Sequence, residues 1–236
     1  MTSTTTPRRR RAQRGSGEDL RAEIVDAAKA LLAKSASADA MSIRAVADAV
    51  GVTAPSIYLH FADKNALLDA VVSDVFAELD TVIQAAAATV PADRPLARLR
   101  AQGLAYVHFA VEHPEHYRVA AMEPCLTPPN VDDVIRSGAF LHFTQTVAAC
   151  MAAGIFADGD PVPVALDLWA AAHGIASLMI AKPYLPWGDI DDIGNRVLRA
   201  AAVGHAVVDL IGADAGPDVV ADWLAAQRHP SRSRKR

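Results

Sequence analysis

Apolar residues recur three or four positions apart along almost the whole chain, which is the spacing of one face of an α-helix. Near the N-terminus, for example, Leu20, Ile24, Ala27, Leu31 and Leu32 fall on one such face. No segment shows the alternation of apolar and polar residues that predicts a half-buried strand, and no pattern repeats at a fixed period. The sequence therefore predicts an all-α protein.

Prolines and glycines divide this pattern, because they interrupt or end helices. The expected helices are residues 18–34, a two-turn helix after Ser42, a short helix after Thr53, a long helix from Asp63 to about Ala88, and residues 94–112, 115–122, 131–153, 161–181, 189–211 and 217–227. A small N-terminal domain over residues 18–75 would be joined by the long helix to a larger helical bundle over residues 76–227. We expect this bundle to be the regulatory and dimerisation domain.

Charge is segregated along the chain. Residues 1–17 contain five arginines and no acid, and residues 228–236 contain four arginines, one lysine and no acid. Since the whole chain has a formal net charge of −4, the part between these ends carries −14. Two basic ends on an acidic body are typical of contact with a polyanion at the ends, although they could equally be disordered solubilising tails. We expect both ends to be disordered.

No uninterrupted apolar run reaches the roughly 18 residues of a membrane span. The best candidate, residues 165–181, contains Asp167 and His173. The basic N-terminus is followed by no apolar stretch, so it does not resemble a secretory signal. Cys125 and Cys150 form no C-x-x-C pair. The sequence thus predicts a cytoplasmic protein with reduced thiols and no membrane contact.

Residues 42–61 carry the functional signal. Ser42 stands where the N-cap of a helix belongs, Gly51 suits a left-handed helix end, and Thr53 can cap the next helix. Two short helices joined by a tight turn are typical of a helix-turn-helix, whose second helix enters the major groove of DNA. Helix-turn-helix shapes also occur in proteins that bind no nucleic acid. In such a protein Tyr58 would be half-buried packing and His60 a solvated surface residue.

The same segment resembles the DNA-binding segment of the TetR family of transcriptional regulators. The similarity lies in the A-x-x-x-G-V turn of residues 47–52, in Tyr58, His60 and Phe61 at the end of the second helix, and in Lys64. It covers about residues 18–75. Trp169, His173 and Gly174, with the motif of residues 113–117, resemble the Trp-His-Gly branch of that family.

The resemblance implies an all-helical homodimer that binds a palindromic operator in double-stranded DNA, mostly as a repressor, and releases it when a small-molecule effector enters the C-terminal domain. The implied DNA contacts are to phosphates from Ser42, Tyr58, His60 and Lys64, and near the bases from Arg44, Thr53 and Ser56. The recognition helix contains no Arg, Asn or Gln, which are the side chains that commonly recognise a base through two hydrogen bonds. Readout would therefore depend on Arg44 or on DNA shape, and the arginines of residues 8–14 would supply electrostatic affinity.

Large side chains in the second half could line the effector pocket. The candidates are Tyr106, Phe109, Phe140, Phe143, Trp169 and His173, and for each of them plain core packing is the alternative. Gly174 would permit close approach of another helix. By the same resemblance, the helices over residues 161–181 and 189–211 would form the dimer interface.

A metal-binding or enzymatic helical protein is the competing class, because histidines and acids cluster between His108 and His116. This cluster contains no E-x-x-H, and Pro114 interrupts it. The chain also lacks the H-E-x-x-H, P-loop, G-x-G-x-x-G and G-x-S-x-G patterns. We therefore expect no enzymatic activity, no metal and no cofactor.

Overall fold

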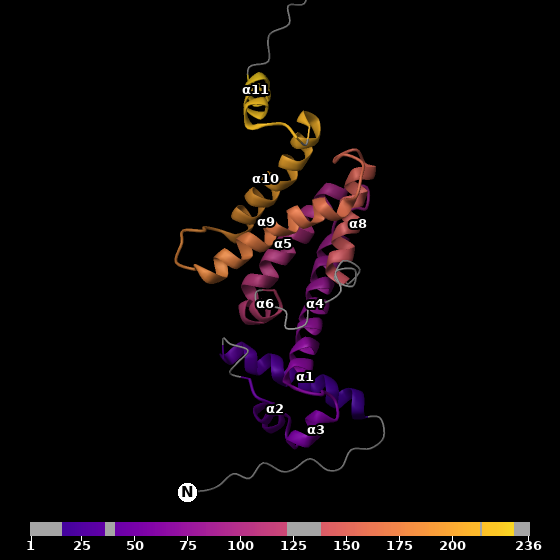
Figure 1. Ribbon diagram of the computed structural model, residues 1–236, viewed down its shortest axis with the longest axis vertical. Coiled ribbons are helices and arrows are strands. Elements are labelled where there is room, and N and C mark those ends of the chain that lie inside the picture. The colour runs from indigo at the N-terminus through magenta and orange to yellow at the C-terminus, as the bar shows by residue number, and fades with distance from the viewer. Residues whose placement is uncertain (1–15, 36–40, 122–137, 213, 229–236) are drawn as a thin grey trace, which may run out of the picture.

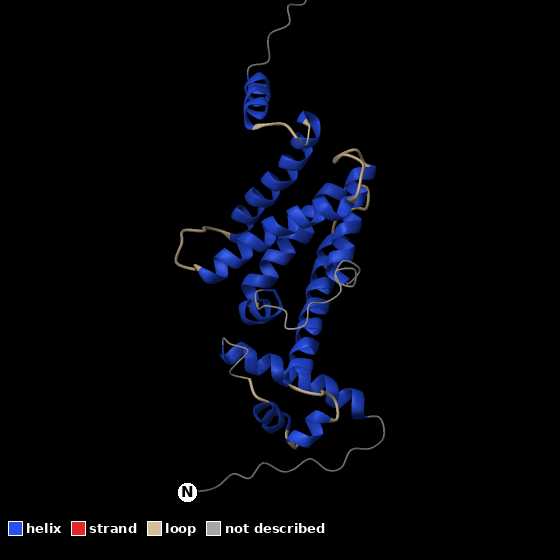
Figure 2. Cartoon of the chain, viewed as in Figure 1, coloured by secondary structure: helices blue, strands red, loops and turns tan. Residues whose placement is uncertain are grey.

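The computed structural model describes residues 16–35, 41–121, 138–212 and 214–228 (Figure 1). In these ranges every regular element is a helix, which confirms the predicted all-α class (Figure 2). The helices are α1 (Ser16–Ser35), α2 (Ile43–Val50), α3 (Ala54–Tyr58), α4 (Lys64–Ala88), α5 (Pro95–Glu112), α6 (Pro114–Ala121), α8 (Gly138–Ala152), α9 (Pro161–Ala181), α10 (Ile190–Ile211) and α11 (Pro217–Arg228). The predicted helix over 131–153 begins outside the described residues. Most of the basic N-terminal arm and nearly all of the C-terminal tail also lie outside them.

Local capping explains where several helices begin and end. The Ser42 hydroxyl accepts a hydrogen bond from the Ala45 N–H at 3.2 Å, and the Asp63 carboxylate accepts one from the Ala66 N–H at 2.8 Å. Gly51 ends α2 in the left-handed conformation at φ 76° and ψ 30°, as its position predicts. Thr53 differs from expectation, because its hydroxyl pairs with the Ser56 hydroxyl at 2.9 Å instead of capping the backbone of α3.

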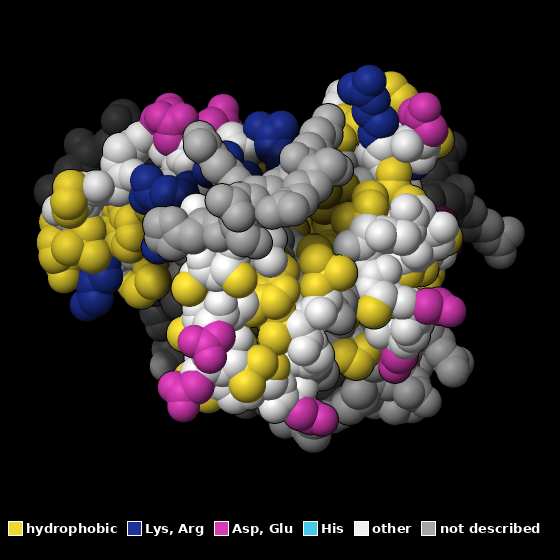
Figure 3. Space-filling view, turned by 90° about the horizontal axis from the view of Figure 1, so that it is seen from above, with side chains coloured by type: hydrophobic (Ala, Val, Ile, Leu, Met, Phe, Trp, Pro, Cys, Tyr) yellow, Lys and Arg dark blue, Asp and Glu magenta, His cyan; other side chains and the backbone are white. Residues whose placement is uncertain are grey.

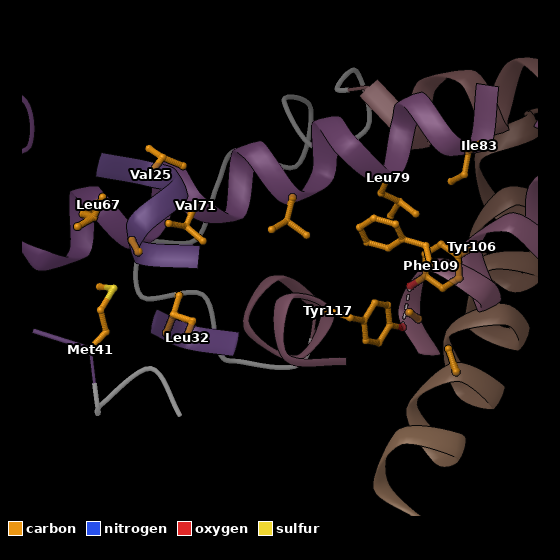
Figure 4. Close-up of a cluster of buried hydrophobic side chains, with 14 of the residues drawn as sticks. Val25, Leu32, Met41, Leu67, Val71, Leu79, Ile83, Tyr106, Phe109 and Tyr117 are labelled. Carbon is orange, nitrogen blue, oxygen red and sulfur yellow. Dashed lines mark hydrogen bonds between the residues drawn. The ribbon is translucent and has the colours of Figure 1, made fainter. Parts of the chain in front are cut away.

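Helix α4 forms the spine of the molecule. Its residues Leu67, Val71, Val75, Leu79 and Ile83 are spaced four apart, and all are buried. One end of this row packs with α1 and the other with α5 and α6, so a single hydrophobic core runs through both halves of the chain (Figure 4). The predicted boundary near residue 75 lies within this helix and stays a prediction.

Helix α5 is the centre of the larger part, where it packs against α4, α8, α9 and α10. Two glycines allow α5 and α10 to approach closely. A Cβ atom at Gly103 would lie 2.9 Å from Leu198 Cδ1, and one at Gly194 would lie 2.9 Å from Leu104 Cδ2. The expectation for Gly174 is wrong, because a Cβ there would meet nothing within 4 Å among the described residues.

Helix α9 is more apolar than the sequence analysis allowed for. Its most apolar stretch has a mean hydropathy of 1.6, which together with its 21 residues is enough, by length and composition alone, to span a membrane. Asp167 and His173 interrupt the run of apolar residues, but they do not lower the mean hydropathy of the stretch enough to exclude it. Helix α9 packs against α5, α8 and α10, yet only 28% of that stretch is buried. The remaining residues of that stretch are partly buried or exposed within the described chain.

Candidate nucleic-acid interface and regulatory core

The end of the molecule opposite α11 presents a helix-turn-helix (Figure 1). Val46 of α2, Ile57 of α3 and Phe61 just beyond it are almost completely buried and anchor both short helices in the core. The opposite side of α3 is left to solvent, where Tyr58 is 53% and Leu59 85% exposed. Burial of one face therefore fixes the other as a projecting surface that can contact a partner.

The seven residues predicted to contact DNA all lie in this unit, at the start of α2, along α3 and at the start of α4. Ser42, Arg44, Thr53 and Tyr58 are exposed, and Ser56, His60 and Lys64 are partly exposed. In the described part of the chain Lys64 has no ion-pair partner, so its charge is available. The structure brings these groups together at one end, and their individual roles stay predictions.

An ion-pair cluster that sequence reasoning missed joins this unit to α4. Lys29 of α1 is only 8% exposed, and its Nζ donates to Asp74 Oδ2 at 2.6 Å and to Glu78 Oε1. Burial alone would lower the pKa of Lys29, but the hydrogen bonds and the two negative charges outweigh burial and raise its pKa. One signal was present in the sequence: Lys29 falls among Val25, Ala28 and Leu32 on the apolar face of α1.

A buried polar network joins α5, α6 and α9. The hydroxyls of Tyr106 and Tyr117 lie 2.8 Å apart, and the Tyr117 hydroxyl lies 2.6 Å from His173 Nδ1. The other ring nitrogen of His173 is 3.2 Å from the Ser177 hydroxyl. Figure 4 shows the two tyrosines facing one another beside the row of α4. Burial raises the pKa of both tyrosines, so they remain neutral donors and acceptors.

The six predicted effector-pocket residues serve mainly as packing in this structure. Tyr106 and Phe109 belong to the main core, and Phe140 and Phe143 pack against a second cluster around Val147 and Cys150. Trp169 lies between the rings of Phe140 and His173, at 6.3 and 5.7 Å. None of the six lines the cavity of about 330 Å³ that lies between α4, α5 and α8. Their contact with an effector stays a prediction.

The state of His173 makes the stability of the fold depend on pH. Burial lowers its pKa below the usual 6.5, so the unfolded chain binds a proton more readily than the folded chain. We expect no loss of stability from this group above pH 6.5, and a progressive loss as the pH falls from 6.5 through the folded pKa. Melting temperatures between pH 7.5 and 5 measure this, and His173→Gln should flatten the dependence. His113→Gln, which replaces an exposed histidine, is the matched control. An unchanged pH dependence in His173→Gln would contradict the assignment.

The histidine cluster near α6 has no metal-binding geometry. His108 Nε2 lies 2.7 Å from Asp191 Oδ1, and the rings of His113 and His116 stack with centroids 6.1 Å apart. Within the ranges that the structure describes, no three metal-ligating side chains converge. The competing metal-binding interpretation therefore finds no support in these residues.

Comparison with known proteins matches both halves of the chain to one family. Residues 24–71 match the family described as bacterial regulatory proteins, tetR family, and residues 99–202 match the tetracyclin repressor-like C-terminal domain. The HTH-type transcriptional regulator EthR of Mycolicibacterium smegmatis is 33% identical over 90 residues, which are 38% of this chain and 41% of that protein. The chain thus aligns with less than half the length of this curated relative.

Solved structures agree with the fold. A protein with unknown function from Rhodococcus sp. RHA1 is 28% identical, with a TM-score of 0.66 and coverage of 79% of this chain and 95% of that chain. A TetR family transcription regulator from Marinobacter aquaeolei VT8 is 17% identical, with a TM-score of 0.61 and coverage of 80% and 98%. At that identity the second likeness concerns the fold alone.

Proposed function

Because the chain belongs to the TetR family of DNA-binding transcriptional regulators, we propose that it represses transcription by binding a palindromic operator as a homodimer. A small-molecule effector that enters the helical C-terminal part releases the operator. The observation that carries the proposal is the projecting side of α3, where Tyr58 stands exposed on a helix whose other face is locked into the core. The family is one of regulators and not of enzymes.

The contacts with DNA divide into two kinds. Tyr58, His60 and Lys64, with Ser42 at the start of α2, hold phosphates and set the position of the protein on the duplex. Arg44, Thr53 and Ser56 lie nearest the bases. Leu59 is 85% exposed, so it can offer an apolar contact of the kind that thymine methyl groups make.

The dimer forms through α9 and α10. Large apolar side chains stand exposed on both helices: Leu166, Trp169 and Leu178 on α9, and Val203, Val208 and Leu210 on α10. Figure 3, which views the molecule from the end uppermost in Figure 1, shows hydrophobic side chains reaching the surface in patches. Exposed apolar area of this kind supports a protein interface, since a helix with more than one apolar side needs cover from elsewhere.

Two finer assignments belong to the same proposal. Placement in the Trp-His-Gly branch rests on Trp169, His173 and Gly174, and a cytoplasmic location rests on the family. The arginines of residues 8–14 add electrostatic affinity from an arm that lies outside the described residues.

Selection of bound fragments from a random DNA library tests the proposal. The full chain should enrich one sequence made of two inverted half-sites, because a two-fold symmetric dimer presents two copies of α3. The mass of the complex, measured by light scattering, should correspond to whole dimers on each selected site. Enrichment of a sequence without inverted symmetry, or no enrichment, would contradict operator binding by a dimer.

A further inference from the structure

A cavity of about 330 Å³ lies between the end of α4, the beginning of α5 and the middle of α8. This size falls in the range of small-molecule sites. Its polar lining consists of Gln84, Arg98, Gln102, His142, Gln145 and Thr146. No aspartate or glutamate is among its lining residues, although the body of the chain is acidic. The wall therefore offers a cation and neutral hydrogen-bonding groups without a carboxylate.

Arg98 supplies the positive charge of this wall. Its Nε donates to the Ala87 carbonyl oxygen at 3.1 Å, which holds the guanidinium against the last turn of α4. Among the described residues, no carboxylate forms an ion pair with Arg98. A guanidinium presents five N–H donors in a planar fork, so most of its donors remain for a partner. A carboxylate is the partner whose geometry matches this fork.

Gln102 lies one helical turn from Arg98 and is the second unusual group. Its side chain is only 2% exposed, and its Oε1 has no hydrogen-bond partner. An unpaired buried carbonyl is costly, and such groups are rare in folded proteins. The missing partner is a donor, either an O–H or an N–H. Residues four apart on a helix are about 5–6 Å apart at Cβ, which sets the spacing between the two ligand groups.

The carboxylate next to the wall, that of Asp80, already has two hydrogen-bonding partners. Asp80 Oδ1 lies 2.8 Å from His142 Nδ1, and Asp80 Oδ2 accepts a hydrogen bond from Gln84 Nε2 at 2.8 Å. The first contact ties α8 to α4 and the second lies within α4, and among the described residues Asp80 forms no ion pair with Arg98. The cavity thus has fixed polar contacts on one side and, on the other, a guanidinium that forms no ion pair among the described residues.

From these observations we infer that the cavity binds a small organic acid that carries a hydroxyl or amine about one helical turn from its carboxylate. The carboxylate accepts hydrogen bonds from the guanidinium of Arg98, and the hydroxyl or amine donates to Gln102 Oε1. That this ligand is the effector rests on the proposed function, whereas binding itself does not. The site differs from the aromatic positions considered in the sequence analysis, none of which lines it.

Titration calorimetry on the full chain without DNA tests the binding. The probes are 3-hydroxybenzoate, 4-hydroxybenzoate and 6-hydroxyhexanoate, each compared with its primary amide and with the acid that lacks the hydroxyl. At least one hydroxy acid should bind at least tenfold more tightly than its amide and than its deoxy analogue. Failure of all three acids to bind, or equal binding of an acid and its amide, would overturn the inference.

Two variants locate the binding. Arg98→Gln should reduce the affinity of the best acid at least tenfold, while Arg196→Gln, an exposed arginine of α10, should leave it unchanged. Gln102→Leu should reduce affinity for the hydroxy acid to that of its deoxy analogue. Without ligand, Gln102→Leu should keep or raise the melting temperature, because it removes an unpaired buried carbonyl. A lower melting temperature would show that Gln102 has a structural partner and would contradict its role as a free acceptor.

Loss of operator binding and loss of acid binding are separate results. Calorimetry without DNA reports only on the cavity, and the DNA library reports only on the helix-turn-helix. An acid that binds at Arg98 supports the site whichever DNA result is found.

Discussion

Replacing Tyr58 and Lys64 together by alanine is expected to weaken specific operator binding strongly while the protein remains folded. Both side chains lie on the projecting end of the helix-turn-helix, and a dimer loses four phosphate contacts. At about 1 kcal/mol for each contact, the affinity falls on the order of a thousandfold. The slope of the logarithm of affinity against that of salt concentration should also flatten, by roughly 0.9 for each phosphate that a Lys64 charge neutralises, because the neutral Tyr58 hydroxyl releases no counterion. Fluorescence anisotropy on the selected operator at several salt concentrations measures both effects.

The chain offers a matched control for this variant. Tyr184 and Lys182 lie in the exposed turn after α9, so Tyr184→Ala with Lys182→Ala removes the same chemical groups at a different place. Its operator affinity should equal that of the unchanged protein. Since Tyr58 is 53% exposed, its removal should alter the melting temperature little. A folded Tyr58, Lys64 double variant with normal operator affinity would refute the proposed interface.

Leu67→Ala is expected to have the largest effect on stability. Leu67 is completely buried where α4 meets the helix-turn-helix, in the same core as Ile57 and Met41. Truncation of a buried leucine costs about 2–5 kcal/mol, because the removed methyl groups lose their burial and leave a cavity. Urea unfolding followed by circular dichroism measures the free energy of unfolding.

Leu59→Ala is the control for Leu67→Ala. It makes the same chemical change on a side chain that is 85% exposed, so the free energy of unfolding should change by less than about 0.5 kcal/mol. The two variants should therefore affect different properties. Leu67→Ala should lower the free energy of unfolding, and Leu59→Ala should weaken only the contact with DNA. A cost below about 1 kcal/mol for Leu67→Ala would show that this core is not packed as described.

Signals that act over a few residues could be predicted well from the sequence. The Ser42 and Asp63 caps and the Gly51 helix end each depend on neighbours within four positions, so their chemistry is visible in the sequence itself. The apolar row of α4 could be predicted for the same reason, because its period alone defines the buried face.

Features that join distant segments could not be predicted in this way. Lys29 meets partners 45 and 49 positions away, and Gly103 meets Leu198 across the contact of α5 with α10. The sequence singled out Gly174, whose neighbours lie farther off, because residue type alone does not say which helices cross at a glycine. Aromatic side chains do not mark the cavity, because its distinctive groups are a buried amide and an arginine that come together only in the fold.

The length of α4 has a mechanical consequence. At about 1.5 Å per residue, its 25 residues make a helix of roughly 37 Å. This helix reaches from the helix-turn-helix to the wall of the cavity. Pivoting such a rod by about 5° displaces its far end by about 3 Å, which is close to the 3.4 Å rise between successive base pairs. In the proposed dimer on DNA, a ligand in the cavity that tilts α4 by this amount would displace both helix-turn-helix units relative to the base pairs.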